Sequence, residues 1–160
     1  MGLRTGFRIN EILSLRVCDV YDGYEIAKVV RVAKGNMKGK KKARTMPLHE
    51  SVREALLALL QSTRMWHPLF RTWALFHAQG RPTRISTRQA FGIIVSAASN
   101  AGLDIERIGT HSMRKTFAKN MWDVVNHDMG KLARLLGHEN FSNTLRYLEF
   151  GDELDAAVLA

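Results

Sequence analysis

Strand-like composition in this chain is concentrated in two short segments on either side of a turn rich in lysine and glycine. Residues 24–32 are rich in β-branched and aromatic side chains, and residues 45–48 form a shorter run around Pro47. Two consecutive strands joined by a tight turn pair antiparallel. A core that has one small hairpin to pack against must be built mainly from helices. We therefore predict a mainly α fold with a small antiparallel β-hairpin or sheet, in the α+β class.

Helical spacing of apolar residues accounts for most of the remaining sequence. The predicted helices cover residues 9–17, 50–61, 86–98, 110–125, 128–137 and 142–150, with a last amphipathic helix within 152–159. Three of these have a residue suited to capping the first turn: Ser86 or Thr87, Thr110, and Asp128. Gly137 is suited to ending the fifth helix. Residues 62–84 hold two of the three prolines, so we expect a structured loop there.

The charge of the chain is positive and unevenly distributed. Lysine and arginine total 24 against 15 acidic residues, which gives a formal net charge of +9. One stretch holds eight basic and no acidic residues: Lys28, Arg31, Lys34, Lys38, Lys40, Lys41, Lys42 and Arg44. Gly35 and Gly39 interrupt it, so an amphipathic membrane-binding helix is disfavoured. We interpret the stretch as a candidate phosphate-binding surface, with a solvated hairpin tip as the alternative.

Several kinds of site and segment are absent from the sequence. Cys18 is the single cysteine, and the Gly35–Lys41 segment is too short for a nucleotide-binding P-loop. The six histidines lack the spacing typical of zinc ligands. No apolar run approaches the roughly 20 residues needed to span a bilayer, and the N-terminus lacks the apolar core of a signal peptide. We therefore expect no cofactor, no metal, no membrane association and a cytoplasmic location.

Three short segments, distant in sequence, carry residues suited to phosphate chemistry. They are TGFRINEIL at residues 5–13, THSMR at 110–114, and LGH at 136–138 with a tyrosine nine residues later, at 147. His111 and Arg114 are three residues apart, so they share one face of a helix. A guanidinium fork matches two phosphate oxygens, and Arg8 can clamp from another segment. Taken singly, each residue has a structural explanation: an ion pair for the arginines, a helix cap for His138 and core packing for Tyr147.

The ordered set, with its spacings, closely resembles the catalytic domain of the tyrosine recombinases, the phage-type integrases. In that family the first arginine lies in Thr-Gly-x-Arg-x-x-Glu-Leu and the second in His-x-x-Arg. A Leu-Gly-His segment follows, and the nucleophilic tyrosine lies nine residues beyond its histidine. The resemblance covers about residues 5–150. It implies the DNA breaking-rejoining fold and a site-specific recombinase or integrase of the kind found in mobile elements, acting through a 3′-phosphotyrosyl intermediate.

The resemblance also implies a role for each matching residue. Tyr147 would attack a DNA phosphodiester, and His111 would transfer a proton beside it. His138 would hydrogen-bond the phosphate, while Arg8 and Arg114 would stabilise the charge of the transition state. Because the covalent link keeps the energy of the phosphodiester, rejoining needs no ATP, in agreement with the missing P-loop.

A hairpin lysine completes the implied site by protonating the leaving 5′ oxygen. Counting back from Arg44 and the second strand favours Lys38, which lies nearest the family's lysine position. Counting forward from Arg8 favours Lys34 instead. We select Lys38, because the register of the second strand fixes the tip, and Lys34 stays the alternative.

The resemblance carries expectations about domains and partners. Complete members have an N-terminal core-binding domain and further helices before the first arginine, whereas seven residues precede Arg8 here. We interpret residues 1–160 as a single catalytic domain lacking both. The expected partner is double-stranded DNA, with self-association on DNA through the C-terminal helix, in a protein of bacterial, archaeal or phage origin. The alternatives are a truncated, catalytically inactive DNA-binding module, a type IB topoisomerase-like enzyme, and a protein-interaction module.

Overall fold

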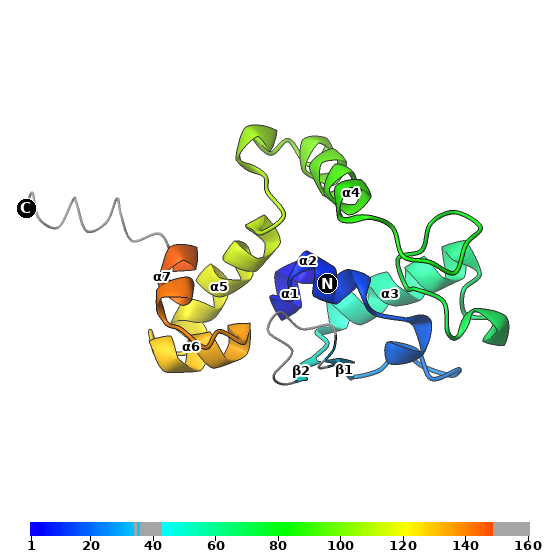
Figure 1. Cartoon of the computed structure of the whole chain (residues 1–160), viewed down its shortest axis with the longest axis horizontal. Coiled ribbons are helices and arrows are strands. Elements are labelled where there is room, and N and C mark those ends of the chain that lie inside the picture. The colour runs from blue at the N-terminus through cyan, green and yellow to red at the C-terminus, as the bar shows by residue number, and fades with distance from the viewer. Residues whose placement is uncertain (34, 36–42, 149–160) are drawn as a thin grey trace, which may run out of the picture.

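The structure is a computed structural model that describes residues 1–33, 35 and 43–148 (Figure 1). Its helices are α1 (Gly2–Thr5), α2 (Ile9–Leu13), α3 (Glu50–Thr63), α4 (Thr87–Asn100), α5 (Ser112–Val124), α6 (Met129–Leu136) and α7 (Ser142–Leu148). Short 3-10 turns occur at η1 (Val17–Asp19), η3 (Pro68–Phe70) and η4 (Ile105–Arg107). Strands β1 (Val29–Val32) and β2 (Arg44–Pro47) pair antiparallel, with Val30 opposite Met46. The predicted mainly α fold with a small antiparallel sheet is confirmed.

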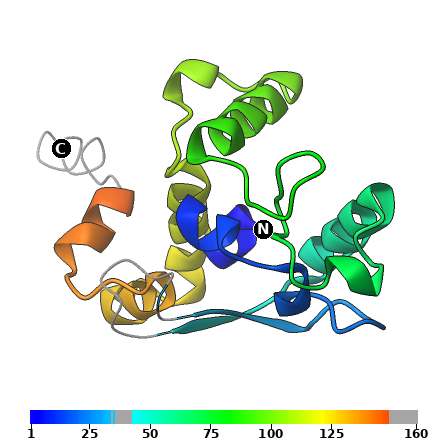
Figure 2. The ribbon, with the colours of Figure 1, turned by 45° about the vertical axis from the view of Figure 1, so that its right-hand side comes forward.

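The short helices α1 and α2 occupy the centre of the molecule. Figures 1 and 2 show them between the group α5, α6 and α7 on one side and α3 on the other, with the hairpin below. Helix α1 packs against α5, and α5 packs against both α6 and α7. This arrangement brings the residues after α1, the start of α5 and the turn after α6 to one place.

Gly6 makes the close contact between α1 and α5 possible. It ends α1 in the left-handed conformation, with φ of 59°, and its N–H donates to the Gly2 carbonyl. A Cβ atom at this position would lie 2.3 Å from a ring carbon of Phe117 on α5. Both the backbone angle and the packing therefore require glycine in the Thr-Gly segment.

Most predicted helix boundaries are confirmed by their caps. Ser86 and Gln89 form a capping box at the start of α4. Asp128 accepts from the N–H of Lys131 at the start of α6, and Gly137 ends that helix with φ of 66°. The expectation for Thr110 was wrong: His111 takes the cap position of α5, and the hydroxyl of Ser112 instead accepts from the Gly109 N–H.

The first predicted helix and the first predicted strand are both shorter than expected. Helix α2 ends at Leu13, because residues 15–17 pair with residues 73–75 of the long loop instead, through bonds such as Leu75 N–H to the Leu15 carbonyl (2.8 Å). The strand begins at Val29, because the Asp22 carboxylate accepts from the N–H groups of Tyr24 and Glu25 and holds a turn there.

The core is apolar and continuous, and it runs from the hairpin to the C-terminal helices. It joins residues of α3, both strands, α5, α6 and α7 to Phe7, which is 1% exposed. The described part of the chain contains no helix that is long and apolar enough to cross a membrane. The predicted helical end at residues 149–150 and the helix within 152–159 lie outside the described residues.

Candidate active site

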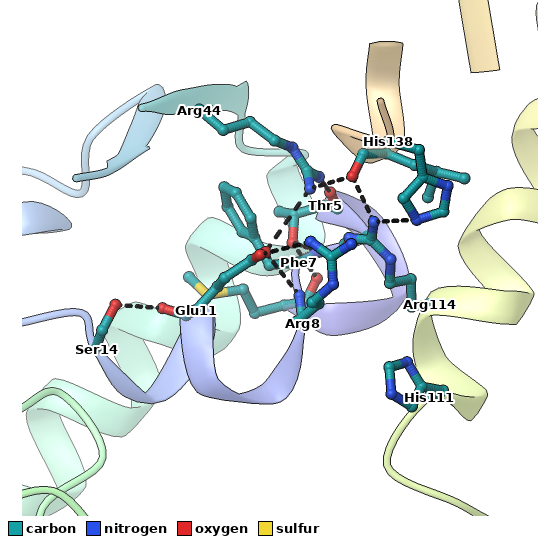
Figure 3. Close-up of polar contacts among 12 residues, drawn as sticks. Thr5, Phe7, Arg8, Glu11, Ser14, Arg44, His111, Arg114 and His138 are labelled. Atoms are coloured by element: carbon teal, nitrogen blue, oxygen red, sulfur yellow. Dashed lines mark hydrogen bonds and ion pairs between the residues drawn. The ribbon is translucent and has the colours of Figure 1, made fainter. Parts of the chain in front are cut away.

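Arg8 is held at the start of α2 by a carboxylate from the same turn. Its backbone N–H donates to Oε2 of Glu11 and its Nη1 donates to Oε1, both at 2.9 Å (Figure 3). Glu11 is 1% exposed, whereas the side chain of Arg8 is 20% exposed. The Glu11 carboxylate therefore accepts both bonds, fixes the backbone of Arg8 at the start of α2 and leaves part of the Arg8 guanidinium exposed.

Arg114 is more deeply buried than Arg8 and lies in the interior between α1, α5 and α6. It is 1% exposed, and its guanidinium donates to the carbonyls of Gly6 and Leu136 and to Nε2 of His138, the last at 2.8 Å. Burial lowers the pKa of Arg114 to about 10, with a further contribution from the charge of Arg8. Arg114 is therefore still a cation at neutral pH, and two segments of backbone hold it in place.

The hydrogen bonds of His138 define its protonation state. A guanidinium has no acceptor, so Nε2 of His138 must accept from Arg114 and the ring proton must reside on Nδ1. Nδ1 lies 2.9 Å from Oγ1 of the buried Thr144, to which it donates. Burial, followed by the charges of Arg114 and Arg8, lowers the pKa of His138 to about 3. His138 is therefore a neutral ring, and a contact with phosphate stays a prediction because both nitrogens have protein partners here.

Tyr147 and His111 complete the group. The Tyr147 hydroxyl lies 2.9 Å from Nδ1 of His111, the exposed residue that precedes α5. The Tyr147 ring stacks on His138, with centroids 5.3 Å apart and an interplanar angle of 20°. The Arg114 guanidinium carbon lies 5.7 Å from the centroid of the Tyr147 ring. The phenol therefore lies beside the imidazoles of His111 and His138 and the guanidinium of Arg114.

The structure brings five of the predicted site residues together: Arg8, His111, Arg114, His138 and Tyr147. Their catalytic roles stay predictions. Lys38 and its alternative Lys34 lie outside the described residues. Within the described part of the chain, no group of three or more His, Cys, Asp or Glu side chains is arranged to hold a metal ion.

Arg44 is a site residue whose position the sequence interpretation missed. Its place in the basic stretch predicts an exposed side chain, yet Arg44 is 8% exposed and its guanidinium donates to the carbonyls of Thr5 and Leu136. The alternation of side chains along a strand could have indicated its burial, because Arg44 lies on the same face as the buried residues Met46 and Leu48. The sequence interpretation also gave no role to the buried Thr144.

The pKa of His138 predicts a pH dependence of folding stability. Its folded pKa of about 3 is below the ordinary 6.5, so the unfolded chain binds one more proton between these values. The free energy of unfolding should therefore fall as pH drops below about 6.5, by at most about 1.4 kcal/mol per pH unit from this group. Denaturant titrations between pH 4 and 7 would measure it. In His138→Asn the free energy of unfolding should fall less steeply with pH than in the wild-type chain, whereas the surface variant His127→Asn should keep the wild-type slope. Equal slopes in the wild-type chain and both variants would contradict the lowered pKa of His138.

Comparison with known proteins places the chain in a family. The model of the phage integrase family matches residues 1–153. The chain is 30% identical over 157 residues to the probable integrase/recombinase YoeC of Bacillus subtilis (strain 168), covering 98% of this chain and 78% of that protein. It is 32% identical over 148 residues to the tyrosine recombinase XerC of Thermodesulfovibrio yellowstonii, covering 89% and 46%. The chain belongs to the phage integrase family, and relatives of it are tyrosine recombinases.

Solved structures agree on the fold. The crystal structure of XerA recombinase is similar, with a TM-score of 0.73 and 22% identity over 98% of this chain and 52% of that one. XerH site-specific recombinase, bound to its difH substrate before cleavage, gives a TM-score of 0.68 and 24% identity over 99% and 43%. The chain therefore spans about half of these recombinases, and the matching half has the tyrosine recombinase catalytic-domain fold.

Proposed function

We propose that this chain is the catalytic domain of a site-specific DNA recombinase, which cleaves and rejoins double-stranded DNA through a covalent tyrosine intermediate. The observation that carries the proposal is the 2.9 Å contact between the Tyr147 hydroxyl and Nδ1 of His111, next to the buried guanidinium of Arg114. A tyrosine packed only for stability has no need of a histidine at its hydroxyl on the exposed side of the site. Membership of the family and the DNA-bound relatives support the same activity.

In the proposed reaction Tyr147 attacks the phosphorus of a DNA phosphodiester in line with the 5′ oxygen. A bond forms between the phenolic oxygen and phosphorus, and the bond from phosphorus to the 5′ oxygen breaks. The phenol, with an ordinary pKa of about 10, needs help to lose its proton. Nδ1 of His111 can take that proton when its Nε2 carries the other one. Lys38, with Lys34 as the alternative, would give a proton to the leaving 5′ oxygen.

The arginines would stabilise the negative charge that develops on the phosphate. Arg8 is the more exposed of the two, and Arg114 lies beneath it as part of the same cationic group. Both are fixed by protein contacts before any substrate arrives, so their dipoles and charges need little reorganisation in the transition state. The neutral His138 would hold Arg114 from one side and support the Tyr147 ring from the other.

The domain organisation and the assembly state are also proposals. Because the chain spans 46% of XerC from Thermodesulfovibrio yellowstonii and 52% of XerA, we infer that its activity is that of a catalytic unit which works with a separate DNA-clamping domain. Self-association on DNA through residues 152–160 is proposed on the apolar residues Leu154, Val158 and Leu159. Deleting residues 152–160 should reduce the mass measured on DNA by light scattering, and an unchanged mass would contradict this contact.

Binding to DNA should weaken steeply with salt. Apart from the buried Arg44, the stretch holds seven basic residues, from Lys28 to Lys42, and no acidic residue lies among them. If about five phosphates are neutralised, log Kd should change with log salt with a slope of roughly 4 to 5 on duplex DNA. The triple variant of Lys40, Lys41 and Lys42 to alanine should bind more weakly to every sequence and give a slope lower by about 2 to 3. Fluorescence anisotropy from 50 to 300 mM salt would test it, and an unchanged slope would remove these lysines from the interface.

The proposed activity is tested with a duplex that carries a nick close to the cleavage site. Cleavage releases the short fragment between the cleavage site and the nick, which carries the new 5′ hydroxyl. Without that hydroxyl the strand cannot be rejoined, so a cleaving enzyme accumulates as a covalent complex visible on a denaturing gel. Salt-sensitive binding without any covalent complex would instead identify a DNA-binding module without activity.

A further inference from the structure

We propose that Arg44, at the first position of β2, is a positioning residue of the active site that aligns Arg8 and His138 without touching substrate. It does so through two groups, the carboxylate of Glu11 and the carbonyl of Leu136 (Figure 3). The effect on chemistry rests on the recombinase function proposed above.

Arg44 contacts two of the segments that carry the site, residues 5–11 and the end of α6. Its Nη1 donates to the Leu136 carbonyl at 3.1 Å and its Nη2 donates to the Thr5 carbonyl. Nη1 also lies 3.8 Å from Oε2 of Glu11, and the guanidinium carbon lies 4.4 Å from the centroid of the Phe7 ring. One buried side chain from the hairpin therefore joins the residues before Arg8, the residue that pairs with it and the end of α6.

The contact with Glu11 links Arg44 to Arg8. The same Oε2 atom that faces Arg44 accepts the backbone N–H of Arg8, and Oε1 accepts Nη1 of Arg8. A carboxylate that is 1% exposed needs a fixed set of donors, because its rotation would leave buried polar groups unpaired. Arg44 therefore restricts Glu11 to the orientation that holds the partly exposed guanidinium of Arg8 in place.

The contact with Leu136 links Arg44 to His138. The Leu136 carbonyl accepts from both Arg44 and Arg114. Gly137 follows with a left-handed backbone, and His138 comes next, stacked on Tyr147. The Gly137 position also packs on Arg44, since a Cβ built there would lie 3.4 Å from Cδ of Arg44. Arg44 thus holds the backbone of the turn that places the imidazole under the nucleophile.

The role requires arginine specifically. The planar fork reaches two carbonyls from different segments, and the flat face lies on Phe7. A lysine keeps the charge but concentrates it on one nitrogen, which cannot reproduce both contacts in the same geometry. Substituting lysine therefore separates the need for a positive charge from the need for the fork.

The test compares Arg44→Lys and Arg44→Gln with the wild-type chain, using Arg53→Lys as the matched control. Arg53 also pairs with a carboxylate, that of Glu50 on the same helix α3. This pair lies outside the site. Thermal melts would show that the compared proteins are folded. The first readout is the ring ¹⁵N NMR spectrum of His138, which distinguishes Nδ1–H from Nε2–H. The second is the single-turnover rate of covalent complex formation at saturating nicked duplex.

Arg44→Lys should stay folded, bind duplex DNA within about threefold of wild type, and form the covalent complex about 100-fold more slowly, the size of effect expected from a small misplacement of catalytic groups. Its His138 should lose the single Nδ1–H pattern, and Arg53→Lys should change neither readout. A folded Arg44→Lys protein with the wild-type His138 pattern and a rate within threefold would overturn the proposal. If the wild-type chain forms no covalent complex, either alone or supplied with the DNA-clamping domain of a relative, the proposed function fails, while the His138 spectrum still decides whether Arg44 positions the turn.

Discussion

Tyr147→Phe should abolish covalent attachment to DNA while leaving duplex binding within about twofold of wild type. The substitution removes the only atom that can form the phosphodiester link. It keeps the ring, whose stacking on His138 does not involve the hydroxyl. A nicked duplex analysed on a denaturing gel measures attachment, and anisotropy with the intact duplex measures binding.

Tyr21→Phe is the matched control for this substitution. The Tyr21 hydroxyl donates to the Gly23 carbonyl in the turn before β1 and contacts no site residue. This variant should keep both binding and attachment. Attachment that survives in Tyr147→Phe would show that another residue is the nucleophile. Loss of attachment in both variants would show that the assay responds to phenylalanine substitution in general.

Arg114→Ala should reduce both stability and chemistry. Truncation leaves the Gly6 carbonyl and Nε2 of His138 without this donor, while the Leu136 carbonyl keeps its bond from Arg44. Each unpaired buried group costs about 1–3 kcal/mol. We expect the free energy of unfolding to fall by about 3 kcal/mol or more, measured by denaturant titration. The folded fraction should form the covalent complex at least 1,000-fold more slowly, because a preorganised charge beside the phosphate is lost as well.

Two further variants separate these effects. Arg114→Lys keeps a charge at the same place, so it should recover part of the stability while remaining slow in chemistry. Arg107→Ala removes an exposed arginine that pairs with Asp104 on the surface, and it should change stability by less than about 1 kcal/mol. If Arg114→Ala were as stable and as active as Arg107→Ala, the buried hydrogen-bond network would have no importance for the site.

The sequence predicted the members of the site better than it predicted their partners. That prediction rests on the gaps between Arg8, His111, Arg114, His138 and Tyr147, which match the order and spacing of the tyrosine recombinase motifs. The structure brings these side chains together. Arg44 could not be placed in the same way, since its role depends on carbonyls 39 and 92 residues away that no local pattern specifies.

Local patterns also failed where distant segments compete for the backbone. Apolar spacing predicted that the first helix would continue to residue 17, but residues 15–17 pair with the loop at 73–75 instead. The composition of residues 24–28 is that of a strand, yet Asp22 holds a turn there through two backbone N–H groups. Counting back from the second strand favours Lys38 and counting forward from Arg8 favours Lys34, and the choice of Lys38 stays a prediction because both residues lie outside the described part of the chain.

The central claim is that Tyr147 forms a bond to the 3′ phosphate of cleaved DNA. The most direct test traps the wild-type chain, alone or supplied with the DNA-clamping domain of a relative, on a nicked duplex and analyses the digested complex by tandem mass spectrometry. We predict that the peptide containing Tyr147 carries a nucleotide attached through its 3′ phosphate, and that the other product ends in a free 5′ hydroxyl. Attachment at any other residue, attachment through a 5′ phosphate, or no covalent complex under either condition would contradict the account.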